Sequence, residues 1–199
     1  MKFVIASANP GKIREMEEIL PECGIEFVTR KDIGIDVEIE ETGATFMENA
    51  MLKATAICNL SGLPSIADDS GLMVEALGSA PGVYTSSFGG EGLRPDERCE
   101  YLLEKLKKLR DEKERSAKFV CTIVCVFPDG EVISAQGECR GRIAHEPAGT
   151  GGFGYDPVFI AEGMEKTMAE ISPEEKNAAS HRGIALREFA RVFRERGTA

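Results

Sequence analysis

The sequence predicts an α/β domain with a mixed, twisted sheet and flanking helices. Helical and extended patterns alternate along the chain, and one long hairpin adds an antiparallel pair to strands that are separated by helices. Of the 199 residues, 42% are hydrophobic and 29% are charged, and no repeat or low-complexity tract interrupts them. This is enough apolar material for a sizeable core, and we expect residues 1–199 to form a single domain.

The amino-terminal region predicts a strand, a helix and a second strand. Residues 2–6 form a short apolar run that is typical of a strand. Apolar residues then recur at helical spacing over 13–20, and we expect Pro21 to end that helix. A second extended run covers 25–29, so the chain begins in the order β, tight loop, α, β. The apolar positions of the helix are Ile13, Met16, Ile19 and Leu20.

A longer helix is predicted from Thr45 to about residue 60. Thr45 and Glu48 have the spacing of a capping box, which is typical of the start of a helix. A short extended run over 65–67 follows and leads into Asp68. The expected inner stripe of this helix consists of Phe46, Ala50, Ala54 and Ile57.

Two further helices are predicted in the second half of the chain. After a glycine-rich loop region over 78–92, Asp96 is expected to cap a helix that reaches about residue 109. The segment 183–196 has the pattern of an amphipathic helix. The expected inward residues are Cys99, Leu102, Leu103, Leu106 and Leu109 in the first of these helices, and Ile184, Leu186, Phe189, Val192 and Phe193 in the second.

A hairpin is predicted between those two helices. The extended runs 118–127 and 131–138 are joined by Pro128, Asp129 and Gly130, a combination that favours a tight turn.

The charge balance argues against a nucleic-acid polymer as the partner. With 24 Lys plus Arg against 34 Asp plus Glu, the net charge is −10, and an acidic surface repels phosphates unless a basic patch is concentrated somewhere. The one candidate run, residues 105–115, alternates in sign and is typical of a solvated helix face with its exit loop. A small anionic ligand in a local basic site remains compatible with this charge.

Several features favour the cytoplasm. The longest nearly unbroken apolar stretch, residues 119–127, is far shorter than the roughly 18 residues that span a bilayer, and the amino terminus lacks the pattern of a secretory signal. We therefore expect no membrane partner. The cysteines are dispersed without a C-x-x-C pair, so reduced and mostly buried thiols are expected. They are Cys23, Cys58, Cys99, Cys121, Cys125 and Cys139.

The first candidate site is the loop between the first strand and the first helix. Backbone N–H groups and the positive end of the helix dipole at such a loop attract a phosphate, and Lys12 adds a charge. The alternative is a plain capping loop, with Asn9 as N-cap and Pro10 at the first helical position. Ala6 and Ile13 stand where a Walker A motif needs Gly and Ser or Thr, so a P-loop NTPase is not indicated. The loop consists of Ser7, Ala8, Asn9, Pro10, Gly11 and Lys12.

The second candidate site is acidic and suits a hard divalent cation. Mg²⁺ takes one or two carboxylates and completes its shell with water and substrate phosphates, whereas a chain with two histidines gives a zinc site little support. Asp68 and Asp69 are expected at a strand end, where one faces a site and the other caps the Ser70–Gly71 turn. The alternative for the acids at 36–41 is an exposed edge strand. The acidic residues of that run are Asp36, Glu38, Glu40 and Glu41.

Three further candidates lie elsewhere. Residues 149–157 contain G-x-G-x-x-G, but Pro157 leads into an extended run rather than a helix, so we expect a loop that lets a flat ligand approach, with Phe153 or Tyr155 able to stack. A basic group at the start of the last helix, with a solvated surface as its alternative, consists of Lys176, Ser180, His181 and Arg182. Lys53, in an otherwise apolar helix stretch, is a weaker candidate for the same anion.

Taken together, five segments resemble the inosine triphosphate pyrophosphatase family, also described as XTP/dITP diphosphatases. They occur in order along the chain and are specific in combination. They are S-A-N-P-G-K at 7–12, E-E-T-G-A-T-F-M-E-N-A at 40–50, A-D-D-S-G at 67–71, G-T-G-G-F-G-Y-D-P at 149–157 and E-K-N-A-A-S-H-R at 175–182.

The resemblance implies two lobes around a central substrate cleft, a homodimer, and Mg²⁺-dependent hydrolysis of ITP, dITP and XTP to the monophosphate and pyrophosphate. By motif position, Glu41 and Asp69 would serve the metal, and Asp69 would also orient or deprotonate the attacking water. Lys53 would join Lys12 in stabilising the phosphates. The resemblance assigns substrate binding to residues 7–12 and to Ser70, Phe153, Gly154, Tyr155, Asp156, Lys176, His181 and Arg182.

Specificity would arise at the purine 6-position. A 6-keto oxygen accepts hydrogen bonds from Arg182 or His181, whereas the amino group of adenine would present donors to donors. Two alternatives stay open: a nucleotide-binding regulatory module that does not hydrolyse, and a septum-inhibitor type of nucleotide pyrophosphatase, whose first loop is similar.

Overall fold

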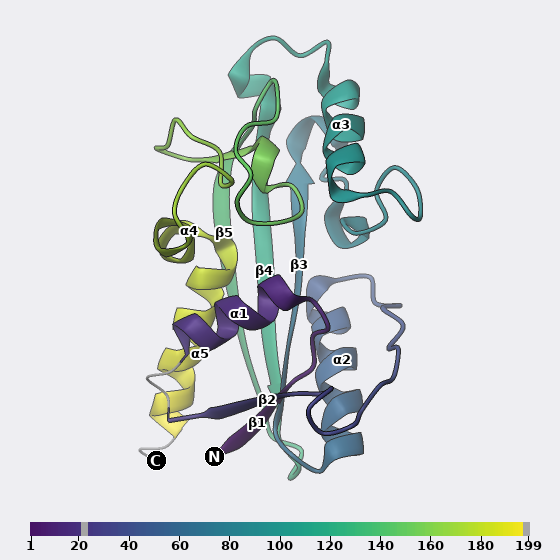
Figure 1. Ribbon diagram of the computed structural model, residues 1–199, viewed down its shortest axis with the longest axis vertical. Helices are drawn as coiled ribbons and strands as arrows, with labels where there is room; N and C mark the ends of the chain where they lie inside the picture. The colour runs from purple at the N-terminus through teal and green to yellow at the C-terminus, as the bar shows by residue number, and fades with distance from the viewer. Residues whose placement is uncertain (21–23, 197–199) are drawn as a thin grey trace. The chain divides into compact units, whose positions relative to one another are not determined.

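The computed structural model describes residues 1–20 and 24–196, and it contains one six-stranded sheet in the order β2-β1-β3-β4-β5-β6 (Figure 1). Strand β1 pairs in parallel with β2 and β3, whereas β5 and β6 are antiparallel. The predicted mixed sheet with flanking helices is therefore confirmed. The strands are β1 (Lys2–Ile5), β2 (Glu26–Thr29), β3 (Ser65–Val74), β4 (Ser116–Val126), β5 (Val132–Ile143) and β6 (Phe159–Ala161).

The helices include all four that the sequence pattern predicts. A further one, α4, was missed because its seven residues are too few for a helical period to show. The α-helices are α1 (Pro10–Ile19), α2 (Phe46–Ser61), α3 (Pro95–Leu106), α4 (Pro173–Ala179) and α5 (His181–Arg196). Short 3₁₀ helices are η2 (Glu75–Leu77), η3 (Gly82–Tyr84), η4 (Glu112–Arg115) and η5 (Asp156–Val158).

Several helix ends differ from expectation. Asp96 lies inside the first turn of α3, and it is Glu97 that accepts a hydrogen bond from the backbone N–H of Arg94, so the expected Asp96 cap is wrong. Helix α3 also ends at Leu106 rather than near residue 109. At α2, the side chain of Thr45 accepts a hydrogen bond from the N–H of Glu48, as predicted. The side chain of Glu48 accepts from the N–H of Ala44, whereas a capping box pairs it with the N–H of Thr45. The expected helix end at Pro21 lies outside the described residues.

The hairpin between β4 and β5 is confirmed. The N–H of Gly130 donates to the carbonyl of Phe127, and the N–H of Phe127 donates to the carbonyl of Glu131. Asp129 accepts from the N–H of Glu131, which fixes the turn. Strand β5 continues five residues beyond the expected end at residue 138, to Ile143.

The described residues divide into two compact units. The first contains those of 1–69, 121–137 and 182–196, and the second contains 70–120 and 138–181. No helix in the described part of the chain is long and apolar enough to cross a membrane.

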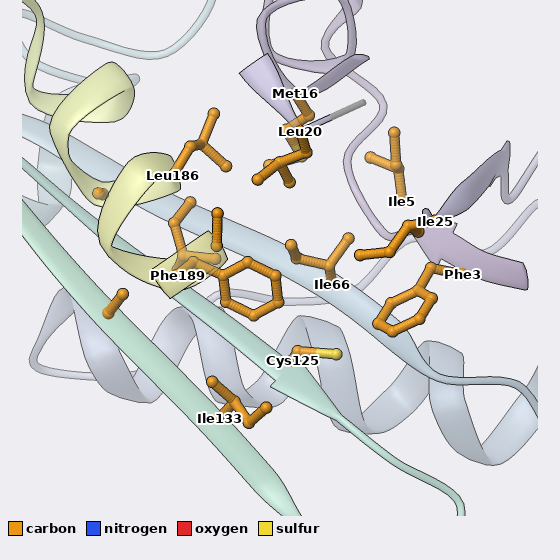
Figure 2. Packing of buried hydrophobic residues seen from close by; sticks show 14 of the residues in the cluster. Phe3, Ile5, Met16, Leu20, Ile25, Ile66, Cys125, Ile133, Leu186 and Phe189 are labelled. Atoms are coloured by element: carbon orange, nitrogen blue, oxygen red, sulfur yellow. The ribbon is translucent and has the colours of Figure 1, made fainter. Parts of the chain in front are cut away.

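In the first unit, the pleat of the strands divides the core into two layers. Phe3 and Ile5 of β1 belong to the layer that holds residues of α1 and α5, while Val4 between them packs with residues of α2. Helices α1 and α5 lie in front of the strands in the view of Figure 1. Figure 2 shows Leu186 and Phe189 of α5 directed towards these strands. Burying each such side chain contributes about 1.5–3 kcal/mol.

Two side chains expected in these layers lie elsewhere. Ile184 of α5 is exposed, and Ala185 occupies the buried position beside it. Phe46, at the first position of α2, is half-buried and lies outside the fully buried stripe of Ala50, Ala54 and Ile57.

In the second unit, α3 packs through Cys99, Leu102 and Leu106 on residues of β3, β4 and β5.

Arg115 was expected on a solvated face but is 1% exposed. Its guanidinium donates to the carbonyls of four residues, which satisfies a buried cation without a carboxylate. The acceptors are Leu106, Leu109, Ile143 and Ala144.

The five described cysteines are buried and form no disulfide among themselves, as expected. Burial raises the pKa of Cys99 and of Cys139 to about 11, so both thiols stay protonated near neutral pH. The sixth, Cys23, lies outside the described residues.

Candidate active site

The loop between β1 and α1 has the predicted capping geometry. The side chain of Asn9 is the N-cap, accepting hydrogen bonds from the N–H of Gly11 at 2.9 Å and of Lys12 at 3.4 Å. Ser7 Oγ in turn accepts from the N–H of Asn9. Pro10 begins the helix, whose first turn contains no acidic residue. Ala8, Asn9 and Pro10 are exposed and the other three residues of the loop are half-buried. The loop leads into the positive end of α1, with Lys12 as its side-chain cation.

Strand β3 runs straight through the segment that was expected to turn. Asp68, Asp69 and Ser70 lie within Ser65–Val74, so the predicted strand end and the Ser70–Gly71 turn are wrong. Neighbouring side chains of a strand point to opposite faces. The structure accordingly places the two aspartates in two different groups of charged residues, both within the first unit.

Asp68 is fully buried among cations from α1 and α5. Its Oδ2 lies 2.9 Å from Lys12 Nζ and accepts from Arg182 Nε at 3.2 Å and from Arg182 Nη2 at 3.1 Å. Arg182 Nη1 also donates to Glu15 Oε2 at 2.5 Å. Burial alone would raise the pKa of Asp68, but Lys12 and Arg182 outweigh it and hold that pKa below its ordinary value.

Asp69 belongs to a second group on the side of α2. Lys53 Nζ donates to Glu41 Oε1 at 2.7 Å and to Asp69 Oδ1 at 3.3 Å, and Asn49 Nδ2 donates to Asp69 Oδ2 at 3.2 Å. Glu41 lies in an irregular segment, so the edge strand considered for residues 36–41 is wrong.

Within this group, Asp69 and Lys53 influence each other's pKa. Burial raises the pKa of Asp69, Lys53 opposes this, and the like charge of Glu41 raises it further, with a net rise. Burial lowers the pKa of Lys53, but Asp68, Asp69 and Glu41 outweigh it, so the pKa rises overall and the ammonium stays charged. Asp69 is therefore a buried carboxylate whose raised pKa suits it to accepting a proton.

The donor set fits a magnesium ion better than an all-protein metal cage. Glu41 and Asp69 direct carboxylate oxygens at one cation, Lys53, and Mg²⁺ typically uses one or two such carboxylates with water and phosphate oxygens. In residues 1–20 and 24–196, no group of three or more His, Cys, Asp or Glu side chains is arranged to hold a metal. Glu41 and Asp69 are the two residues that the family resemblance assigns to the metal.

A third group lies in the second unit and centres on Asp156. Its Oδ2 accepts from Lys176 Nζ at 2.7 Å and from the N–H of Phe153 at 2.7 Å. The Lys176 ammonium also lies 4.4 Å from the centre of the Phe153 ring, within cation–π range. A Cβ on Gly152, at φ +68°, would come within 2.0 Å of Asp156 Oδ2, so the loop requires glycine there.

The two aromatic residues of this loop have different surroundings. Tyr155 is 2% exposed within the core, and its hydroxyl donates to the carbonyl of Thr85, so the expectation that it can stack on a ligand is wrong. Phe153 is half-buried. Gly154 separates the two and accepts a weak hydrogen bond from Cys99 Sγ. The glycine run precedes η5 rather than an α-helix, as its sequence context predicted.

His181 and Arg182 are adjacent but differently packed. The His181 ring stacks on Phe119 with centroids 4.6 Å apart and an interplanar angle of 11°. Both residues are buried at the start of α5, so the alternative of a solvated surface is wrong for them. Lys176 is likewise buried, in α4.

Sequence reasoning assigned no role to Glu15, Asn49 or Phe119. The sequence spacing could have revealed Glu15 and Asn49. Glu15 follows Lys12 by three residues on α1, and Asn49 precedes Lys53 by four on α2. Each therefore shares a helix face with a candidate site residue. No sequence pattern indicated Phe119, because only the folded chain brings β4 next to His181.

We expect Arg182→Ala to destabilise the chain strongly. The change would leave the buried carboxylates of Glu15 and Asp68 without their shared partner, which typically costs about 3–5 kcal/mol. Denaturant unfolding followed by circular dichroism measures this. Arg191→Ala is the matched control, because Arg191 pairs with Glu188 and Glu195 on the exposed face of the same helix. Equal stability losses in the two variants would contradict the ion-pair account.

Comparison with known proteins agrees with the motifs. The chain is 48% identical to a dITP/XTP pyrophosphatase of Aquifex aeolicus, over 98% of this chain and 97% of the relative, and 47% identical to one of Shigella flexneri, over 94% of each. A solved HAM1 protein of Coxiella burnetii superposes with a TM-score of 0.89 at 42% identity, covering 98% of this chain and 99% of that chain. The sequence profile of the Ham1 family matches residues 3–192, and the chain belongs to the Ham1 family.

Proposed function

We propose that this protein hydrolyses the non-canonical purine nucleoside triphosphates dITP, XTP and ITP to the monophosphate and pyrophosphate, and so removes them from the nucleotide pool. The enzyme class follows from its relatives: the chain is a hydrolase that acts on phosphoanhydride bonds. The single structural observation that carries the proposal is the convergence of Glu41 and Asp69 on Lys53, beside Asp68 and Lys12 on the opposite face of β3.

The phosphates would bind at the loop of residues 7–12. Its exposed backbone leads into the positive end of α1, and Lys12 supplies a full charge at that end. Lys53 would supply a second charge from α2, because its ammonium stays protonated among three acids. Ser70, the next residue along β3 after Asp69, would contact the substrate from the same strand.

Asp69 would orient the attacking water and accept its proton. Asn49 holds one carboxylate oxygen and Lys53 holds the other, so the direction of the group is fixed before the substrate arrives. Glu41 and Asp69 would hold Mg²⁺, which when bound supplies positive charge to the phosphate oxygens. Hydrolysis then breaks the bond that joins the α-phosphate to pyrophosphate, and the water oxygen stays on one of the two products.

The purine would be recognised by residues of the 149–157 loop and of α4 and α5. The half-buried Phe153 would stack on the base, and Asp156 holds both that loop and Lys176 in place. His181 and Arg182 would donate to the 6-keto oxygen of the purine, which adenine lacks. Arg182 would do so while paired with Glu15 and Asp68.

Three further properties are proposed from the resemblance. They are a bilobed arrangement around a substrate cleft, a homodimer and a cytoplasmic location.

The direct test is pyrophosphate release from dITP, XTP, ITP, ATP and GTP, with and without Mg²⁺. We expect turnover of the first three, slower turnover of ATP and GTP by about 10-fold or more, and loss of activity when EDTA removes the metal. Tight ITP binding without pyrophosphate release would instead support a regulatory nucleotide-binding module. Equal rates on all five would contradict the proposed specificity.

We expect Asp69→Asn to fold and to lose most turnover, by about 100-fold or more in kcat, because the metal and the water both lose a charged ligand. Asp36→Asn is the matched control, because Asp36 is exposed and its replacement removes the same negative charge. Steady-state kinetics with dITP, alongside circular dichroism for folding, measures the difference. Near-normal turnover in Asp69→Asn would refute the assigned role.

A further inference from the structure

Asp68 has no assigned role, although it is the more deeply buried of the two aspartates. It is 1% exposed, and its Oδ2 receives three donors, one from Lys12 and two from Arg182. Placing a carboxylate in such surroundings is costly unless cations pair with it. Replacing a complete group of buried ion pairs by hydrophobic side chains is often neutral for stability, so a functional reason for these charges is worth seeking.

The group around Asp68 carries no net charge. Lys12 and Arg182 contribute two positive charges, and Asp68 and Glu15 contribute two negative charges. Attraction of a phosphate by net charge is therefore not what the group provides. The contribution it can make is geometric, because it determines where the Lys12 ammonium lies.

Lys12 benefits from such an anchor. A lysine side chain has a flexible four-carbon stem and loses rotamer freedom when its ammonium is fixed on a ligand. The ammonium has three donors, and its 2.9 Å contact with Asp68 uses one of them. The side chain keeps 16% of its surface exposed, and Asp68 leaves two of the three donors for a ligand at the start of α1.

Arg182 and Glu15 hold the anchor itself. The guanidinium approaches Asp68 Oδ2 through both Nε and Nη2, and its other arm reaches Glu15 on α1. Helix α1, strand β3 and helix α5 are thus connected through one buried arginine. Asp68 cannot turn away from Lys12 without breaking these bonds.

We propose that Asp68 is a positioning residue for phosphate binding: it holds the Lys12 ammonium at the start of α1, and Arg182 and Glu15 hold Asp68. This rests on the proposed function, in which Lys12 contacts a substrate phosphate. Asp68 itself touches no substrate.

A double-mutant cycle with inorganic triphosphate as the probe tests the proposal. Binding is measured by calorimetry at fixed Mg²⁺ for the unmodified chain, Asp68→Asn, Lys12→Ala and the double variant. We expect Asp68→Asn to weaken binding about fivefold or more when Lys12 is present, and by less than about twofold when Lys12 is alanine. A role in stability alone would lower the melting temperature without this dependence on Lys12.

The results that would overturn the positioning role differ from the result that would overturn the phosphate site. Removing a negative charge near the phosphates would tighten binding if charge alone mattered, so unchanged or tighter binding by Asp68→Asn overturns the proposal. Equal weakening with and without Lys12 also overturns it. If Lys12→Ala itself leaves triphosphate binding unchanged, the phosphate site of the proposed function fails instead.

A second variant covers the case in which Asp68→Asn does not fold. Asp68→Glu keeps the charge that Arg182 requires and displaces the carboxylate by one methylene. The same criteria apply to it: weakening that depends on Lys12 supports the proposal, and weakening that does not depend on Lys12 contradicts it.

Discussion

Side chains alternate between the two faces of β3, and this alternation determines how the charged residues of the site are grouped. Because neighbouring residues of a strand face opposite sides, Asp68 and Asp69 cannot share one group of partners. Each carboxylate is buried and therefore needs its own cation: Lys12 and Arg182 on one side, and Lys53 on the other. The cations come from three helices, α1, α2 and α5, so the packing of these helices on the first unit's strands determines the geometry of both groups.

The two groups suit different tasks. The group around Asp68 is balanced in charge, and its Arg182 pairs with both Asp68 and Glu15. The group around Asp69 is more open, because the side chain of Glu41 is 40% exposed and Lys53 faces two acids. Buried ion pairs fix positions, whereas a pair of carboxylates with one accessible member can exchange a lysine contact for a metal and water.

The local structure that the sequence predicted correctly follows from local chemistry. Asn9 and Pro10 specify the start of α1, and Asp129 with Gly130 specifies the hairpin turn. The run over 67–71 was misjudged because aspartate, serine and glycine disfavour strands and favour turns. Pairing with cations from helices distant in sequence outweighs that preference, and one sequence does not reveal such pairing. The same holds for Tyr155, whose burial depends on packing with Thr85, seventy residues earlier in the chain.

We propose that the adjacent aspartates perform different tasks: Asp69 acts in turnover, and Asp68 holds the lysine that we propose to bind phosphate. Measuring kcat and KM for dITP side by side in Asp68→Asn and Asp69→Asn separates these two tasks. We expect the Asp69 change to lower mainly kcat and the Asp68 change to raise mainly KM. The same pattern of change in both variants would mean that the two aspartates share one task.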